Sequence, residues 1–360
     1  MRVQRLVDGE TTWTVVDERG VPVGVVDDFL AYLQAIERSP NTIRAYAHDL
    51  KTFWAFLRHE GLSHEDVTGE DLARFIRFLR RPHPDVSVIS EDGAARKAST
   101  VNRVMAAVSG LYTFLADRGT SEAGERLLRQ ARLARRPTVA LLDGIPKRES
   151  QQQVVGPRLK PQPTPLTVLT VEQARAVIDA CSNLRDRLLF TILFTTGMRR
   201  GQALGLRPED LDTRARTITI RPRPDNENGA RAKTRETRVI PVTTEVTRLY
   251  LDYMHTEYGA IDSDYVFINL WGGDIGRAMT DKNLDAVVKR LRTRTAIEGW
   301  SCHTLRHTWA TLHHRAGMPI EVISHLLTHG NVVTTAEIYT HMDAEDLRRT
   351  LERHGCLEAT

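Results

Sequence analysis

Apolar residues at helical spacing constrain the fold of this chain more than any other feature. Ser39 and Pro40 predict a helix start, because serine is a favoured N-cap and proline a favoured first helical residue. The helix that follows is predicted to bury one apolar stripe, made of Ile43, Tyr46, Leu50, Phe53, Trp54 and Leu57. Similar stripes follow a helix start at Thr68 and run through residues 99–115, where Gly119 ends the pattern. Residues 25–119 are therefore predicted to form a helical domain.

The second half of the chain combines helices with one pair of strands. Thr170 and Gln173 predict a capping box, and the apolar run 188–194 predicts a buried helix that ends at Gly197. Residues 217–220 and 237–242 are strand-like, and the polar segment 221–236 joins them. Further helices are predicted at about 244–257, 281–293, 304–316 and 320–328. The predicted fold class is mainly α with a small antiparallel β-sheet, and the second domain is predicted to span residues 166–360.

Between the two domains, residues 120–165 are predicted to form a basic, proline-containing linker. This segment holds nine Lys or Arg residues, including Arg135 and Arg136, against four acidic ones. Basic residues bind the phosphates of nucleic acids without regard to base sequence, so a contact with DNA is one interpretation, and a merely soluble tether is the other. Residues 1–24 are predicted to be a short N-terminal extension, with strands on either side of a turn at 17–20, and no function is assigned to them.

Composition is that of a globular protein of about two domains. The 360 residues are 41% hydrophobic and 27% charged, and no apolar run approaches the ~20 residues that span a bilayer. Three scattered cysteines argue against a disulfide framework, and no signal peptide is apparent. A cytoplasmic protein without a membrane partner is therefore expected. The net charge of +4 permits binding to nucleic acid but does not argue for it.

The residues with the clearest chemistry lie near the C-terminus. His303, Arg306 and His307 are followed by His329 and Tyr339. Arginine binds phosphate oxygens, histidine moves protons near neutral pH, and a tyrosine can be a covalent nucleophile. Together they indicate phosphoryl transfer through a tyrosyl-phosphate. The i, i+4 histidine pair also has a zinc-ligand spacing, but Thr304 stands where a metalloprotease has its glutamate, and Arg306 would repel a cation. No metal is expected.

The pattern H-x-L-R-H followed by Y-x-H resembles that of the tyrosine recombinases, which include the phage integrases. The segment 196–204 resembles the box that carries the first arginine of this family, here Arg199, and the segment 233–242 resembles its lysine hairpin, here Lys233. A segment around residues 265–283 resembles the transposon-encoded members. The resemblance implies a two-domain DNA clamp, with a helical core-binding domain before the linker and a catalytic domain after it.

The resemblance also implies a role for each residue of the site. Arg199 and Arg306 would hold the non-bridging phosphate oxygens, with His303 and His329 as further donors. Lys233 would protonate the departing 5′-oxygen, and Tyr339 would form a 3′-phosphotyrosyl link that needs neither metal nor ATP. His307 is expected either to orient its neighbours or to transfer a proton.

Three departures from the family pattern and three DNA contacts complete the predicted site. Gln202 stands where most members have a carboxylate, Thr328 replaces the usual glycine before His329, and the His329–Tyr339 spacing is one residue longer than the commonest one. The side chains that could face DNA from the helical domain are those of Lys97, Asn102 and Arg103, and a solvated face is the alternative.

The predicted function is site-specific DNA recombination by an integrase or transposase of a mobile element. The expected partners are double-stranded DNA, further copies of the chain in a synaptic tetramer, and accessory DNA-binding proteins, which places the protein at the nucleoid. Two alternatives remain. One is DNA relaxation of the type IB topoisomerase kind, and the other is a catalytically silent DNA-binding protein.

Overall fold

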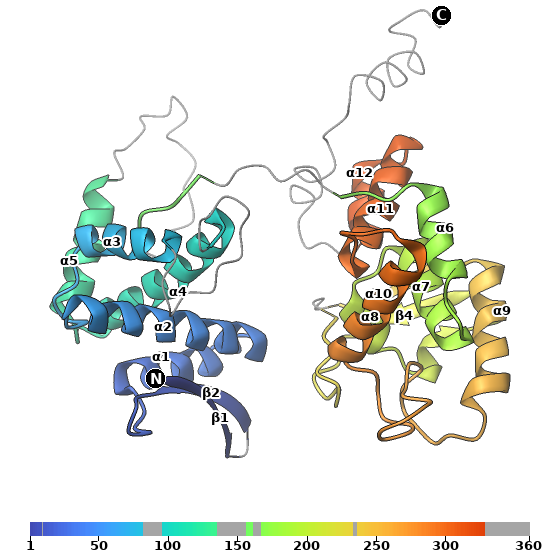
Figure 1. Cartoon of the computed structure of the whole chain (residues 1–360), viewed down its shortest axis with the longest axis horizontal. Coiled ribbons are helices and arrows are strands. Elements are labelled where there is room, and N and C mark those ends of the chain that lie inside the picture. The colour runs from blue at the N-terminus through green and yellow to red at the C-terminus, as the bar shows by residue number, and fades with distance from the viewer. Residues whose placement is uncertain (9, 82–95, 135–155, 161–166, 233–235, 328–360) are drawn as a thin grey trace, which may run out of the picture. The chain divides into compact units, whose positions relative to one another are not determined.

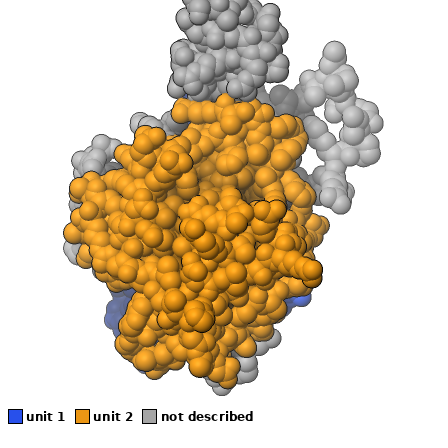
Figure 2. All heavy atoms as spheres, turned by 90° about the vertical axis from the view of Figure 1, so that its right-hand side faces the viewer, with its two compact units in different colours: residues 1–163 blue, residues 164–360 orange. Residues whose placement is uncertain are grey.

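The computed structural model describes residues 1–8, 10–81, 96–134, 156–160, 167–232 and 236–327. The chain divides into two compact units, unit 1 in residues 1–163 and unit 2 in residues 164–360 (Figures 1 and 2). The described residues are mostly helical, with a two-stranded sheet in unit 1 and a three-stranded sheet in unit 2, both antiparallel. The predicted fold class is confirmed. Within these ranges, no helix is both long and apolar enough to cross a membrane.

Unit 1 combines five helices with a hairpin that packs on α1 and α2, counting the elements that the structure describes (Figure 1). These elements are β1 (Arg2–Asp8), β2 (Glu10–Val16), α1 (Gly24–Ala35), α2 (Pro40–Glu60), α3 (Gly69–Arg80), α4 (Ala98–Asp117) and α5 (Glu122–Ala134). The helix starts follow the predicted chemistry. The Ser39 hydroxyl accepts a hydrogen bond from the Thr42 N–H at 3.2 Å, and Thr68 and Asp71 cap each other at the start of α3.

The N-terminal residues differ from the prediction in their pairing. Strand β2 pairs with β1 along its whole length, and residues 21–25 contribute only an isolated bridge between Val16 and Pro22. The turn at Asp17 is present, because the Asp17 carboxylate accepts the N–H groups of Arg19 and Val21. Val15 is fully buried in the core of unit 1. The first residues are therefore part of this unit.

The segment expected to be a linker begins with a packed helix. Helix α5 contacts α4, and its residues Ala123 and Leu127 are buried in the core of unit 1. Gly124 permits this contact, because a Cβ there would lie 2.9 Å from the carbonyl oxygen of Tyr112. Residues 156–160 also lie against α4. Proline and charge marked this segment as unlike its flanks, but they did not reveal that parts of it are packed.

Unit 2 is built around the buried helix α7. Its described elements are α6 (Val171–Asp179), α7 (Leu184–Thr196), α8 (Arg200–Leu204), η1 (Pro208–Asp210), β3 (Leu211–Asp212), β4 (Thr217–Ile220), β5 (Arg238–Pro241), α9 (Thr244–Tyr253), η2 (Met254–Tyr258), α10 (Asp281–Thr295), α11 (Cys302–Arg315) and α12 (Ile320–Leu326). Helix α7 contacts α6, α9 and α11, which explains its mostly apolar run at residues 188–194. The helix predicted at 244–257 ends with a π-helical turn, η2, and the remaining helices start and end within a few residues of their predicted bounds.

Candidate active site

Arg199 lies where the central helix of unit 2 stops, as predicted. Helix α7 ends at Gly197, whose φ of 64° is the left-handed conformation that favours glycine. A Cβ at this position would lie 2.8 Å from the ring of Trp309 and 2.9 Å from Leu327, so close packing also requires a glycine. Arg199 then caps α8, and its N–H donates to the side-chain oxygen of Gln202 at 2.7 Å. The amide at Gln202 therefore holds the backbone of Arg199.

Arg306 reaches the same place from α11. Its side chain is buried, and its guanidinium donates from Nη1 to the carbonyl oxygen of Gly197 at 2.8 Å and from Nη2 to that of Leu327 at 2.6 Å. Arg199 donates to the Leu327 oxygen as well, at 3.4 Å. The two nitrogens that share this oxygen are therefore at most 6.0 Å apart, which is the sum of the two distances.

This convergence makes a positive site from residues 107 positions apart in the chain. Neither guanidinium loses its proton at physiological pH. Repulsion between two cations at this separation costs on the order of 3 kcal/mol at an effective dielectric constant of ~20, and an anion between them offsets that cost. The geometry suits a phosphate, whose oxygens accept hydrogen bonds from arginine side chains.

His303 and His307 lie one turn apart on α11 beside Arg306. Their rings contact edge to face, with centroids 4.5 Å apart. His303 is exposed, whereas burial, followed by the nearby His303 and Arg306, lowers the pKa of His307 to about 4. His307 is therefore neutral at neutral pH. This favours an orienting role over the donation of a proton, and the two roles were left open by the sequence.

The hairpin that leads to Lys233 is anchored to this scaffold. The Asn228 side chain donates to the carbonyl oxygens of Leu204 at 3.0 Å and Met279 at 2.8 Å. Further along, the backbone of Arg231 touches Gly201, where a Cβ would lie 2.6 Å from the Arg231 oxygen. Gly201 is two residues after Arg199, and Arg231 is two residues before Lys233. The structure thus brings the approach to Lys233 against the helix that Arg199 caps.

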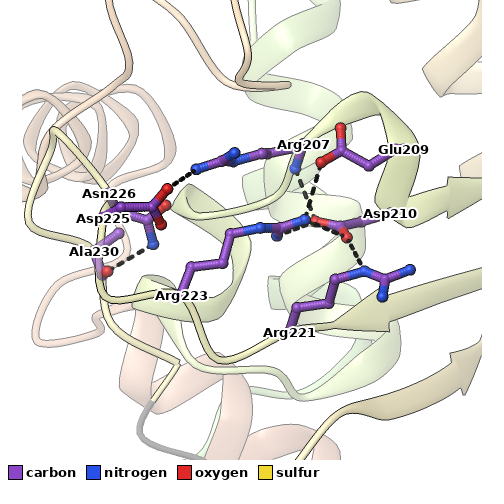
Figure 3. Close-up of polar contacts among 8 residues, drawn as sticks. All are labelled: Arg207, Glu209, Asp210, Arg221, Arg223, Asp225, Asn226 and Ala230. Atoms are coloured by element: carbon purple, nitrogen blue, oxygen red, sulfur yellow. Dashed lines mark hydrogen bonds and ion pairs between the residues drawn. The ribbon is translucent and has the colours of Figure 1, made fainter.

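A buried carboxylate, Asp210, secures the start of the same hairpin (Figure 3). Asp210 accepts hydrogen bonds from Arg221 at 3.0 Å, from both terminal nitrogens of Arg223, and from the Arg207 N–H at 3.0 Å. Its side chain is fully buried, while that of Arg223 is 12% exposed. Arg207 in turn pairs with Asp225. The prediction from sequence did not include Asp210, because a single Asp after Pro-Glu carries no motif.

Five predicted site residues lie outside the residues that the structure describes. They are Arg135, Arg136, Lys233, His329 and Tyr339. Leu327, whose carbonyl oxygen both arginines contact, is the last described residue before the segment that contains His329 and Tyr339. Among the described residues, no group of three or more His, Cys, Asp or Glu side chains could hold a metal ion.

The three predicted DNA contacts of unit 1 lie on or next to α4, and two of them contact other parts of unit 1. Lys97 is exposed at the N-cap of α4. Arg103 forms an ion pair with Asp49, a residue of α2 that is 2% exposed. Burial raises the pKa of Asp49 to about 6, and Arg103 opposes that shift. The carboxamide of Asn102 is engaged at both ends by the backbone of Leu159.

The sequence did not single out two further cations of unit 1, Arg44 and Lys51. The pKa of His48 is lowered, by burial first and then by Arg44, Lys51 and Arg103, so each of these three cations lies near His48. The usable signal was the helical register of α2, which places Arg44, His48 and Lys51 at intervals of four and three residues.

Comparison with known proteins places this arrangement in a family. Residues 167–346 match the model of the phage integrase family, and residues 26–119 match that of the phage integrase N-terminal SAM-like domain. Transposase A from transposon Tn554 of Staphylococcus aureus is 32% identical over 359 residues, which cover 98% of each chain. Tyrosine recombinase XerD of Mycobacterium leprae is 29% identical and covers 89% of this chain and 93% of its own length.

Solved structures share the fold. The integrase of the Tn1549 transposon, in complex with a circular intermediate DNA, has a TM-score of 0.63 at 18% identity and covers 92% of this chain and 99% of its own. The XerH site-specific recombinase, bound to its palindromic difH substrate, has a TM-score of 0.59 at 19% identity and covers 87% of this chain and 80% of its own. With the two arginines on one site and both family models matched, the chain belongs to the phage integrase family and is a tyrosine recombinase, a DNA strand-transferring enzyme.

Proposed function

We propose that this enzyme is the integrase or transposase of a mobile element and that it acts through a phosphotyrosyl bond to Tyr339. The observation that carries the proposal is the meeting of Arg199 and Arg306 at the carbonyl oxygen of Leu327, 12 residues before Tyr339 in the chain. The similarity to a transposase along 98% of the chain supports the mobile element. The relatives do not favour DNA relaxation or a catalytically silent protein.

In the proposed reaction, the two arginines hold the non-bridging oxygens of a DNA phosphate. Tyr339 gives its phenol proton to water, and its oxygen attacks phosphorus and forms the new P–O bond, while the bond to the 5′-oxygen breaks. Lys233 gives its proton to that leaving oxygen, and His303 and His329 donate hydrogen bonds to the phosphate. Preorganised positive charge is the largest contribution, because charge on the phosphoryl oxygens must be stabilised without a metal. The covalent link keeps the bond energy, so a second 5′-hydroxyl can rejoin the strand.

DNA binding is proposed for both units. Residues 25–119 would lie on one side of the duplex through Lys97, Arg103 and the cations near His48, and residues 166–360 on the other. The basic segment 120–165, with Arg135 and Arg136, would add contacts that do not depend on base sequence. Residues 1–24 would extend the first unit. A synaptic tetramer, accessory DNA-binding proteins and a place at the nucleoid complete the proposal.

The test is covalent trapping on a nicked DNA substrate that carries an end of the encoding element. After cleavage next to the nick, a short fragment diffuses away, and the enzyme stays attached to DNA through Tyr339. The wild-type chain should give a covalent complex on a denaturing gel, and Tyr339→Phe should give none, although it binds DNA equally well in a gel shift. A covalent complex with Tyr339→Phe would remove Tyr339 from this role. Relaxation of supercoiled DNA without recombinant product would instead favour a topoisomerase.

A further inference from the structure

Asn102, predicted to contact DNA, instead binds a segment of the chain itself. Its side-chain nitrogen donates to the Leu159 carbonyl oxygen at 2.8 Å, and its side-chain oxygen accepts the Leu159 N–H at 2.8 Å. A carboxamide has the same donor and acceptor as a peptide group, so this pair reproduces one rung of a β-ladder. The two residues are 57 positions apart. Asn102 therefore recognises backbone.

A second anchor lies two helical turns further along α4. The N–H of Gly156 donates to the Ser109 hydroxyl at 3.3 Å, and Gly156 is buried. A Cβ on Gly156 would lie 3.0 Å from both the Met105 methyl group and the Ser109 oxygen, so this close approach favours glycine. The Leu159 side chain packs against the core of unit 1. Residues 156–160, which we call the strap, are thus docked along α4 at two points.

Docking of the strap shortens the chain that connects the units. Leu159 is held by α4, and the Leu169 N–H donates to the Thr308 hydroxyl in unit 2 at 2.9 Å. Ten residues separate these anchors, so their Cα atoms lie at most ~36 Å apart. Without the strap, the nearest described anchor in unit 1 would be α5, which ends at Ala134, 35 residues before Leu169. Docking of the strap therefore shortens the tether between the two units by up to 25 residues.

We propose that Asn102 is a positioning residue whose carboxamide docks the strap on α4 and thereby sets how far unit 2 can reach from unit 1 on DNA. The part that concerns DNA rests on the proposed function, while docking of the strap does not. Two linked binding sites raise each other's effective concentration, which falls roughly as the −3/2 power of tether length beyond the optimal span. A change from 10 to 35 residues corresponds to a loss of DNA affinity of up to roughly sixfold.

The first experiment is hydrogen–deuterium exchange of the full-length chain, read by mass spectrometry on a peptide that covers the strap. The variant Asn102→Leu removes both hydrogen bonds, and exchange of the Leu159 amide should rise roughly thirtyfold. The matched control is Asn41→Leu, the same change at an exposed asparagine of α2, which should leave the strap unchanged. Gly156→Val acts from the strap itself and leaves α4 intact, and it should also speed exchange. Unchanged strap exchange in both Asn102→Leu and Gly156→Val would overturn the proposal.

The second experiment compares the DNA affinity of the same variants with that of the wild type. We expect Asn102→Leu and Gly156→Val to bind a full site several-fold more weakly, and to bind a DNA too short for both units as well as the wild type does. If the variants lost as much affinity for the short DNA as for the full site, Asn102 would be a direct DNA contact, which would contradict the positioning role. If the wild type bound no DNA, the proposed function would fail, while the exchange experiment would still decide whether the strap is docked.

Discussion

Alanine at Gly201 tests whether the hairpin before Lys233 must sit at one distance from Arg199. A Cβ at Gly201 would lie 2.6 Å from the Arg231 oxygen and 3.2 Å from its nitrogen, whereas ordinary contact begins at 3.4 Å. Both opposing atoms are backbone, so rotation of a side chain cannot relieve the clash. The hairpin must move away by about 0.8 Å, the difference between the ordinary contact and the oxygen distance.

This displacement should reduce catalysis much more than stability. A misplacement of about 1 Å can cost ~10²-fold in rate, because a proton donor must be within hydrogen-bond reach of the leaving oxygen. Overpacking costs about 1–3 kcal/mol, and alanine recovers up to ~1 kcal/mol of that because glycine is unfavourable in a helix. We therefore expect DNA cleavage to slow about a hundredfold while the free energy of unfolding falls by less than about 2 kcal/mol.

The assay is single-turnover cleavage of the nicked substrate, with thermal unfolding measured in parallel. Gly24→Ala is the matched control, because nothing lies within 4 Å of a Cβ at that position. A substrate with sulfur in place of the 5′-bridging oxygen provides a second check. A thiolate leaves without protonation near neutral pH, so cleavage of this DNA by Gly201→Ala should approach the wild-type rate. Cleavage of ordinary DNA by Gly201→Ala within threefold of the wild type would refute the reasoning.

Three further predictions follow from the described contacts. Arg306→Lys should slow DNA cleavage at least ~10²-fold, since one ammonium cannot reproduce the two-armed contact of the guanidinium. DNA binding in a gel shift should remain nearly intact. Equal losses of cleavage and binding would argue against a catalytic role. Asp210→Asn should lower the free energy of unfolding in urea by about 2–3 kcal/mol, because it leaves Arg223 without its buried anion. Asp225→Asn, which removes only the exposed partner of Arg207, should lower it by clearly less. His307 should titrate by NMR near pH 4, below its unfolded value of 6.5, so its contribution to stability is complete above pH 6.5 and is lost as the pH falls toward 4. The variant His307→Gln should lose less stability over this pH range. A measured pKa of His307 above 6 would contradict the burial argument.

Local chemistry made much of the fold predictable. Ser39, Thr68 and Thr170 each start a helix by accepting a backbone N–H, as their sequence context predicts. Gly197 ends α7 because it adopts a positive φ, and the strand 217–220 has the predicted bounds. These features depend on residues a few positions apart, so the sequence contains the whole cause. The packing of residues 156–160 against α4 joins residues 57 positions apart, and the sequence analysis did not predict it. The pairing of β2 with β1 was also missed, although it is local.

The sequence by itself determined the family and the order of its motifs, and it predicted the catalytic groups, because each motif is a local run of residues with its own chemistry. Only the tertiary structure decided that Arg199 and Arg306 meet at the Leu327 oxygen, that Asp210 holds the arginines of the hairpin, and that Asn102 binds the strap. These contacts join residues from 11 to 128 positions apart. A hydrogen bond requires two atoms at about 3 Å, and sequence spacing sets that distance only within a helix, strand or turn. Over longer separations, the packing of α7 against α11 and of the strap against α4 sets it.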